Sequence, residues 1–173
     1  MDKLAAAYLE SIRSSDPKIE LKKLTSEEYS RAARSWKKTL ANSRLSYSRD
    51  IRKWAADGAW ERYVLLEDGI AKGIAILDLK HVADSGVLYV CQIAAFEEHR
   101  GYGKKLLDLS FELPGVKMMY LMAERESGDM LQQFYRSYGM HEHVSRSGTH
   151  WFFKTKDPDG YEEALTYVKN HTF

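Results

Sequence analysis

Two glycines follow an apolar segment in the middle of the chain, at a place where a helix is predicted to begin. The segment reads Ile93-Ala-Ala-Phe-Glu-Glu-His-Arg100-Gly101-Tyr102-Gly103-Lys-Lys105. Glycine has no Cβ, so its backbone can turn sharply and lie close to a bulky anion. The first turn of a helix adds unpaired N–H donors and the positive end of the helix dipole. The pattern predicts a turn that binds a pyrophosphate, although a tight strand-to-helix turn without a ligand has the same signature.

Two common glycine motifs do not fit this turn. No third glycine follows Gly103 at the dinucleotide-binding spacing, and Lys104 is not followed by the Ser or Thr of a P-loop. The Arg-Gly-x-Gly core at Arg100–Gly103 instead resembles the coenzyme A loop of the GNAT acetyltransferase superfamily. That loop has the pattern Gln/Arg-x-x-Gly-x-Gly/Ala, and this chain departs from it by having Glu98 in the opening position.

A second segment supports this resemblance. Phe134-Tyr135-Arg-Ser-Tyr-Gly139-Met140 is similar to the family pattern Tyr-x-x-x-Gly-Phe, with Met in place of Phe. In many family members this tyrosine protonates the coenzyme A thiolate, so the resemblance implies that role for Tyr135. A half-buried aromatic residue that only packs its ring is the alternative interpretation.

The composition of the whole chain is that of one soluble globular domain. It has 173 residues, of which 44% are apolar and 29% charged, and we expect a single domain over 1–173. One cysteine excludes an intrachain disulfide and fits a reducing compartment, so we expect a cytoplasmic location. No apolar run approaches about 18 residues, and the first residues predict an amphipathic helix rather than a signal peptide. We find no ligand set that would complete a metal site, so no metal is expected.

Hydrophobic periodicity and turn signals divide the chain into alternating elements. Thr25-Ser-Glu-Glu28 is a capping box, and Asp68-Gly69 indicates a hairpin. Predicted strands lie at 19–24, 62–67, 73–80, 87–96, 117–124, 144–146 and 151–154; predicted helices lie near the N-terminus, at 25–40 and 47–57, after Gly103, around 131–138 and at 161–168. With the resemblance, this order implies an α/β (α+β) fold: a mixed, mostly antiparallel central sheet of about seven strands with helices on both faces and extra N- and C-terminal helices.

The resemblance also implies where acetyl-CoA would bind as cosubstrate. Family members separate the fourth and fifth strands, so that free N–H groups of the fourth strand bind the pantetheine arm and the acyl oxygen. Here those groups belong to Cys91, Ile93 and Ala95, and the pyrophosphate would bind the backbone of Arg100, Gly101, Tyr102, Gly103, Lys104 and Lys105. The two lysines could add charge, or they could simply face solvent.

The general base is where this chain departs most from the family. The histone-acetyltransferase branch has a glutamate thirteen residues before the loop arginine, and that position is Val87 here. Glu124 and, less well, Asp78 are candidates, and the alternatives are a water relay or ordinary surface carboxylates. Cys91 has no assigned base, so we interpret it as a small buried residue rather than an acyl-carrying nucleophile.

One basic segment bears on the acceptor. Residues 31–53 contain eight Lys and Arg and one acidic residue, Asp50, which gives a net charge of +7 in a chain whose total is +1. In this family the first two helices line the cleft that binds the acceptor. Because this lining would be positively charged, a phosphate-bearing or nucleic-acid acceptor would fit. Two helices with solvated basic faces would have the same composition.

The leading hypothesis is an acetyl-CoA-dependent N-acetyltransferase that moves an acetyl group to an unidentified amine by direct attack in a ternary complex. One alternative is a catalytically degenerate module of the same fold that binds coenzyme A or nucleic acid. Another is transfer of a different acyl or aminoacyl group. We expect a monomer or a homodimer, with no membrane partner.

Overall fold

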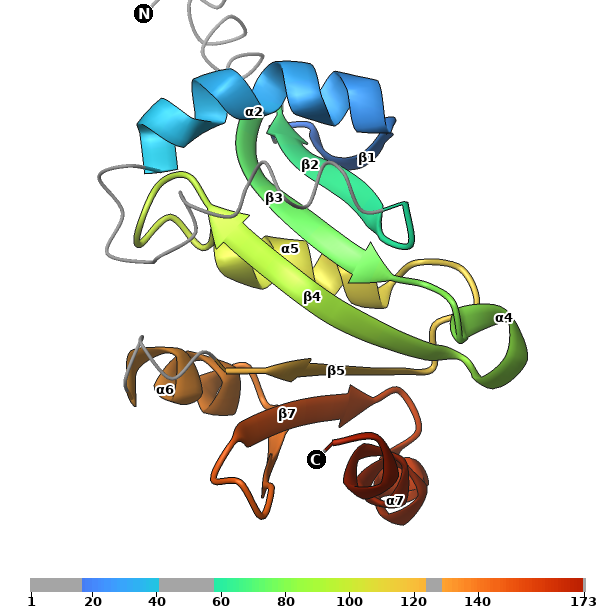
Figure 1. Cartoon of the computed structure of the whole chain (residues 1–173). Coiled ribbons are helices and arrows are strands. Elements are labelled where there is room, and N and C mark those ends of the chain that lie inside the picture. Colours follow the sequence, from blue (N-terminus) through green and yellow to red (C-terminus); the bar gives the residue numbers. More distant parts are fainter. Residues whose placement is uncertain (1–16, 41–57, 124–128, 173) are drawn as a thin grey trace, which may run out of the picture.

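The computed structural model describes residues 17–40, 58–123 and 129–172, and its centre is a sheet of seven strands (Figure 1). The strands follow the order β1-β2-β3-β4-β5-β7-β6, and only β4 and β5 run parallel. Their bounds are β1 Ile19–Leu24, β2 Glu61–Glu67, β3 Ile70–Asp78, β4 Val87–Ala95, β5 Met118–Met122, β6 His141–Val144 and β7 His150–Thr155. The predicted fold class, a mixed and mostly antiparallel sheet, is therefore confirmed.

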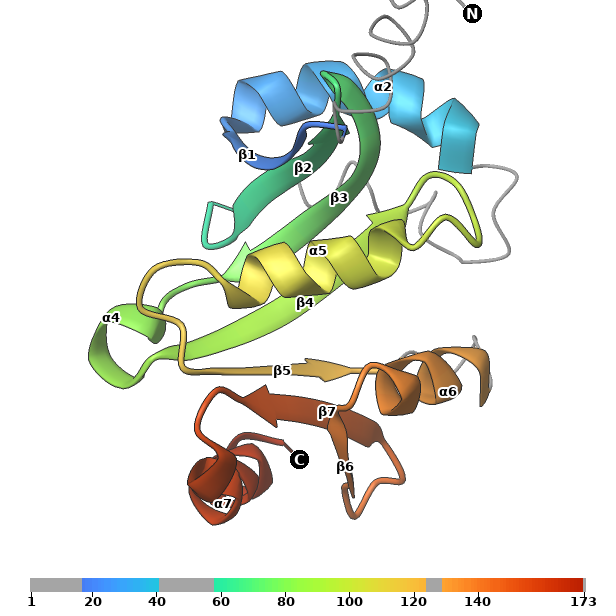
Figure 2. The same cartoon turned by 180° about the vertical axis from the view of Figure 1, so that it is seen from behind.

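Helices cover both faces of this sheet. The helices are α2 (Ser26–Leu40), α4 (Val82–Ser85), α5 (Tyr102–Phe111), α6 (Asp129–Ser137) and α7 (Tyr161–His171), with a short 3₁₀ helix η3 (Pro158–Gly160) before α7. Residues of α5 and α6 share a core with one face, and Figure 2 shows α5 in front of β3 and β4. Residues of α2 and α7 pack against the other face. None of the described helices is long and apolar enough to cross a membrane.

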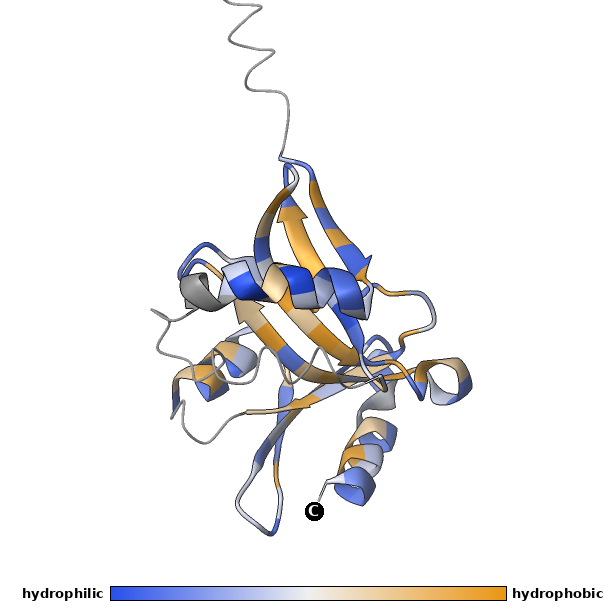
Figure 3. Cartoon of the chain, turned by 45° about the horizontal axis from the view of Figure 1, so that its top comes forward, coloured by the Kyte–Doolittle hydropathy of each residue, from blue (hydrophilic) through white to orange (hydrophobic). Residues whose placement is uncertain are grey.

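The sequence fixes the start of α2 through the predicted capping box. The Thr25 N–H donates to Glu28 Oε2 at 2.8 Å, and the Glu28 N–H donates to Thr25 Oγ1 at 3.1 Å. These bonds satisfy two backbone donors at the helix start. Tyr29, Ala33 and Trp36 then face the sheet and are buried, as their spacing predicted. Figure 3 shows the hydrophilic residues on the outer side of this helix.

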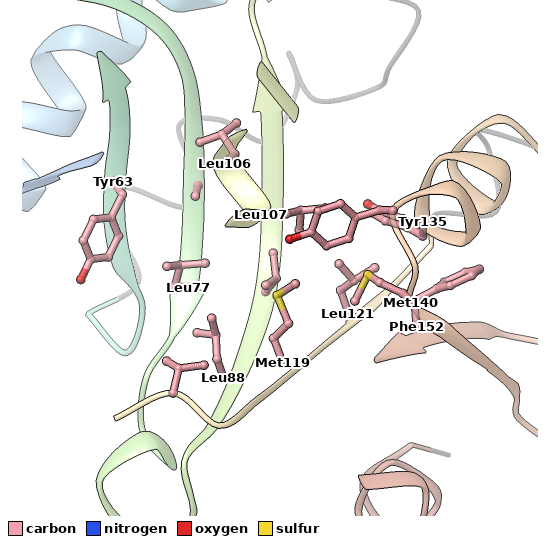
Figure 4. Packing of buried hydrophobic residues seen from close by; sticks show 14 of the residues in the cluster. Tyr63, Leu77, Leu88, Leu106, Leu107, Met119, Leu121, Tyr135, Met140 and Phe152 are labelled. Carbon is pink, nitrogen blue, oxygen red and sulfur yellow. The ribbon is translucent and has the colours of Figure 1, made fainter. Parts of the chain in front are cut away.

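The larger part of the core lies between the sheet and helices α5 and α6 (Figure 4). Leu106 and Leu107 of α5 are fully buried there, together with Leu88 of β4 and Phe152 of β7. Burying one such side chain contributes about 1.5–3 kcal/mol. These contacts hold α5 against β3 and β4, and so they fix where its N-terminus lies.

Three predicted helices and strands differ from the structure or lie outside the described residues. The strand expected at 144–146 is β6, which ends at Val144; Ser145 begins the turn to β7. The Ser145 N–H bonds to the Thr149 carbonyl, and Ser145 Oγ lies 2.8 Å from Ser147 Oγ, so polar side chains close the turn. The short helix α4 was not predicted. The helices expected near the N-terminus and at 47–57 lie outside the described residues.

Gly73 gives a test of how tightly α5 packs on the sheet. A Cβ at this position would lie 2.8 Å from the Ala94 carbonyl oxygen and 2.9 Å from Leu106 Cδ1. Gly73→Ala should therefore lower the free energy of unfolding by roughly 1–3 kcal/mol, measured by urea denaturation. Gly58→Ala is the matched control, because a Cβ there has no neighbour within 4 Å. Equal stabilities of the two variants would contradict the close packing.

Candidate active site

Strand β4 pairs with a different strand on each edge: β3 pairs with Tyr89–Ala95, and β5 pairs only with Val87–Tyr89. Val87, Leu88 and Tyr89 pair with Met118–Tyr120 of β5. Beyond Tyr89 the two strands diverge, as Figure 1 shows, and β5 continues along β7. No strand among residues 17–40, 58–123 and 129–172 pairs with this edge of β4 beyond Tyr89, and a cavity lies beside Tyr89–Ile93.

Backbone geometry decides which donors of β4 point into this cleft. The Phe96 N–H donates to the Lys72 carbonyl on the β3 side at 2.9 Å. Because N–H directions alternate along a strand, those of Ala95 and Ile93 point the other way, towards the cleft. Cys91 is the extra residue of a β-bulge, since Gln92 lies opposite Ile76 while Val90 lies opposite Leu77. A bulge turns the strand locally and is common beside active sites.

A small cavity of about 80 Å³ occupies the point of divergence. It is lined by Tyr89–Ile93 of β4, Leu121 and Met122 of β5, and Leu131 and Tyr135 of α6. Tyr135 is buried, with its ring centroid 5.3 Å from that of Phe134 and 5.2 Å from that of Phe152. Three residues predicted from the sequence, Cys91, Ile93 and Tyr135, therefore line one cavity, which is large enough for a small acyl group.

The glycine turn joins β4 to α5 and presents the start of the helix. Gly101 has φ +76°, a conformation that favours glycine, and His99 before it also has a positive φ of 59°. The Lys105 N–H donates to the Gly101 carbonyl at 3.1 Å, which is the first hydrogen bond of the helix ladder. The N–H groups of Tyr102, Gly103 and Lys104 precede that ladder, so they are the donors that an anion could use.

Tyr102 anchors this turn to the sheet. Its ring is buried, and its hydroxyl donates to Glu67 Oε2 of β2 at 2.5 Å. That hydrogen bond, helped by the nearby charge of Lys105, lowers the pKa of Glu67. Lys105 Nζ lies 3.6 Å from Glu67, whereas Lys104 is exposed. The side chain of Tyr102 thus has a structural role, which leaves its backbone N–H for the predicted anion site.

A second hollow of about 350 Å³ lies between α5 and α6, next to the glycine turn. Its lining residues are Lys104, Asp108, Phe134, Ser137, Tyr138 and Lys154. The Tyr138 hydroxyl donates to Asp108 at 2.7 Å, and burial and this bond raise the pKa of Tyr138. The Phe134 ring lies 3.4 Å from the Cβ position of Gly103, so α6 contacts the start of α5 directly.

The structure leaves some predicted residues untested. Val87 is buried with α7 and offers no carboxylate, as the sequence indicated. Glu124, the predicted base, lies outside the described residues. Of the eight basic side chains in segment 31–53, only those of Arg31 and Arg34 are described; both are exposed, and Arg31 pairs with Glu27 at 3.2 Å. No pattern in the sequence indicates the anchoring role of Glu67.

Comparison with protein-family models and with curated proteins finds no match. Solved structures do match. The PaiA N-acetyltransferase of Thermoplasma acidophilum in complex with coenzyme A is 18% identical, with a TM-score of 0.56, over 80% of this chain and 99% of that one. The N-acetyltransferase PseH of Campylobacter jejuni in complex with acetyl coenzyme A is 13% identical, with a TM-score of 0.57, over 81% and 100%. Aminoglycoside acetyltransferase AAC(6')-Ib with coenzyme A is 14% identical, with a TM-score of 0.58, over 86% and 99%.

A GNAT-family protein of Desulfovibrio desulfuricans is similar at 15% identity and a TM-score of 0.56, over 79% of this chain and 96% of that one. These likenesses show that the chain has the fold of the GNAT acetyltransferases, as the sequence resemblance implied.

The bond between Tyr102 and Glu67 makes a prediction about pH. In Tyr102→Phe the pKa of Glu67 should rise towards its ordinary value, and the free energy of unfolding should fall. A carboxylate whose pKa is lowered on folding stabilises the protein above its unfolded pKa of about 4.3 and loses that effect as the pH falls through the folded pKa. The deficit of the variant should therefore be largest near neutral pH and shrink on acidification. Carboxyl NMR titration measures this, and an unchanged pKa of Glu67 would contradict it.

Proposed function

We propose that this chain transfers an acetyl group from acetyl-CoA to an amine. The observation that carries the proposal is the edge of β4 with which no described strand pairs beyond Tyr89. Ile93 lines a small cavity there, and the Ala95 N–H points to the same side, next to a helix N-terminus. A peptide-like arm can pair with a free strand edge, and a pyrophosphate fits a helix start. Two of the similar structures are described as complexes with coenzyme A, and another as a complex with acetyl coenzyme A, which supports the same ligand here.

The parts of acetyl-CoA would be distributed over the three features of the site. The N–H groups of Tyr102, Gly103 and Lys104 would bind the pyrophosphate, with Gly101 turning the backbone and Arg100 at its edge. The pantetheine amides would pair with β4 at Ala95 and Ile93. The acetyl group would then lie in the 80 Å³ cavity beside Cys91. The nucleotide would follow the hollow between α5 and α6, where Lys104 and Lys154 supply positive charge.

The proposed reaction is direct attack within a ternary complex. The amine nitrogen forms a bond to the thioester carbonyl carbon, and the carbon–sulfur bond then breaks. Backbone N–H groups near the bulge stabilise the negative charge on the carbonyl oxygen. The thiolate takes a proton from the Tyr135 hydroxyl, and the amine gives up a proton to a base, for which Glu124 stays the proposal. Holding both substrates in line supplies much of the rate enhancement.

The glycine turn can be tested by changing bulk and charge separately. At Gly103 a Cβ would make only an ordinary contact, 3.4 Å from the Phe134 ring, so substitution should not prevent folding. Gly103→Gln adds bulk and should weaken coenzyme A binding. Gly103→Glu adds the same bulk and a negative charge beside the pyrophosphate, and it should weaken binding further. Isothermal titration calorimetry measures both, and unchanged affinity in folded Gly103→Glu protein would show that the pyrophosphate binds elsewhere.

The proton donor can be tested with two tyrosines of the same region. Tyr135→Phe should lower kcat by roughly 10²-fold, which is the range of one general-acid contribution. Coenzyme A affinity should change little. Tyr138→Phe is the control for kcat, because its hydroxyl bonds to Asp108 in the hollow proposed for the nucleotide and does not line the cavity proposed for the acetyl group. Thiol release from acetyl-CoA with an amine acceptor is the assay. Full activity of Tyr135→Phe would return Tyr135 to a packing role, and no thiol release by the parent protein would favour a binding module.

A further inference from the structure

A row of side chains crosses four strands on the face of the sheet opposite α5. Asp78 of β3 lies opposite Tyr89 of β4, and Tyr89 lies opposite Tyr120 of β5. Directly opposite residues share a face, and Val87, two residues before Tyr89, packs with α7. We call the following residues the aromatic row: Asp78, Tyr89, Tyr120, Trp151 of β7 and Tyr167 of α7.

The rings of the aromatic row are in mutual contact. The centroid of Tyr120 lies 4.9 Å from that of Tyr89, 6.2 Å from that of Trp151 and 5.8 Å from that of Tyr167. All members of the row are partly exposed, unlike the core residues on the other face. Tyr89 also lines the cavity where β4 and β5 diverge. The row is therefore continuous with the cleft, on the side away from α5.

The charge environment of the row is negative. Burial raises the pKa of Tyr89 to about 12, and the Asp78 carboxylate acts in the same direction. Burial is also the largest cause that raises the pKa of Tyr120 and of Tyr167; neighbouring tyrosines act next on Tyr120, and Asp78 adds to both. No lysine or arginine in the described part of the chain lowers these three values, whereas Lys23 does so for Tyr63.

A backbone hydrogen bond holds the carboxylate of Asp78 in place, and no cation of the described residues pairs with it. Its Oδ1 accepts the Lys80 N–H at 2.9 Å, which fixes the side chain at the end of β3. Within residues 17–40, 58–123 and 129–172 it forms no ion pair. Aromatic faces attract cations, and a neighbouring carboxylate adds to that attraction.

We propose that the aromatic row binds a cationic group of the acceptor, so that the substrate class is an amine carrying a second positive charge. This rests on the proposed acetyl transfer. Tyr89 lies two residues from Cys91, which is at most about 7 Å along a strand and less where the strand bulges. A short diamine spans a comparable distance, and so one nitrogen can meet the acetyl group while the other lies on the row. The basic segment 31–53 favours an acceptor that carries negative charge instead. The two hypotheses therefore predict opposite orders of kcat/KM for cationic and anionic acceptors.

The first experiment compares matched acceptors in the thiol-release assay with acetyl-CoA. The acceptors are 1,4-diaminobutane, the neutral-tailed 1-aminopentane and the anionic-tailed 5-aminopentanoate. The value of kcat/KM should fall in that order. In Asp78→Asn, which keeps the oxygen that accepts the Lys80 N–H, the preference for the diamine over 1-aminopentane should drop about fivefold, the effect of one partly exposed charge. Glu112→Gln removes the same charge at the end of α5 and should leave the preference unchanged.

The second experiment detects binding without turnover. Titration with 1,4-diaminobutane should shift the ¹⁵N-labelled indole signal of Trp151, identified with Trp151→Phe, but not that of Trp36, which α2 buries against the sheet. The shift should need about fivefold more diamine in Asp78→Asn.

The outcomes separate this proposal from the proposed function. A shift of Trp151 that weakens in Asp78→Asn supports the cation site, even if no acceptor is acetylated, in which case the proposed transferase activity fails alone. Acetyl transfer with equal or reversed ranking of the three acceptors overturns the cation site and leaves the transferase standing. The cation site is also overturned if the diamine does not shift the Trp151 indole signal, or if it shifts that signal equally in the parent protein and in Asp78→Asn.

Discussion

Strand β4 must satisfy its backbone polar groups in two different ways along its length. Over Val87–Tyr89 it pairs with β5, from Tyr89 to Ala95 it pairs with β3, and beyond Tyr89 no described strand pairs with its β5-side edge. Buried N–H groups without partners are costly, so a free edge inside a fold calls for water or a ligand. The bulge at Cys91 falls at the point where the pairing changes. The cavity, the position of Tyr135 and the path proposed for acetyl-CoA all follow from this single loss of pairing.

The core holds the glycine turn next to that free edge. Leu106 and Leu107 fix α5 on the sheet, and the turn between β4 and α5 has no freedom to move the helix start away from the cleft. The bond from Tyr102 to Glu67 adds a tie to β2, and Phe134 adds a contact with α6. An anion bound at the helix start and an acyl group in the cavity would thus be held by elements that share one core. Such fixed placement is what direct attack within a ternary complex requires.

The sequence predicted the features that depend on local patterns. The capping box of α2, the hairpin at Asp68-Gly69 and the glycine turn at Gly101 and Gly103 each depend on neighbouring residues. The role proposed for Tyr135 comes from a resemblance, and the structure shows only that Tyr135 lines the cavity. The tie between Tyr102 and Glu67 joins residues 35 apart, and the aromatic row depends on strand register. Neither leaves a local pattern, so neither could be predicted from the sequence alone.

Amide hydrogen exchange along β4, measured with and without acetyl-CoA, tests most directly whether the edge of β4 binds the ligand. If the free edge binds the pantetheine arm, the amides of Ile93 and Ala95 should exchange more slowly when acetyl-CoA is bound. The amides of Tyr102, Gly103 and Lys104 should be protected with them, because the same ligand would cover the helix start. Amides that already pair with β3, such as that of Phe96, should change far less. Saturating acetyl-CoA without added protection at Ile93 and Ala95 would contradict the central claim.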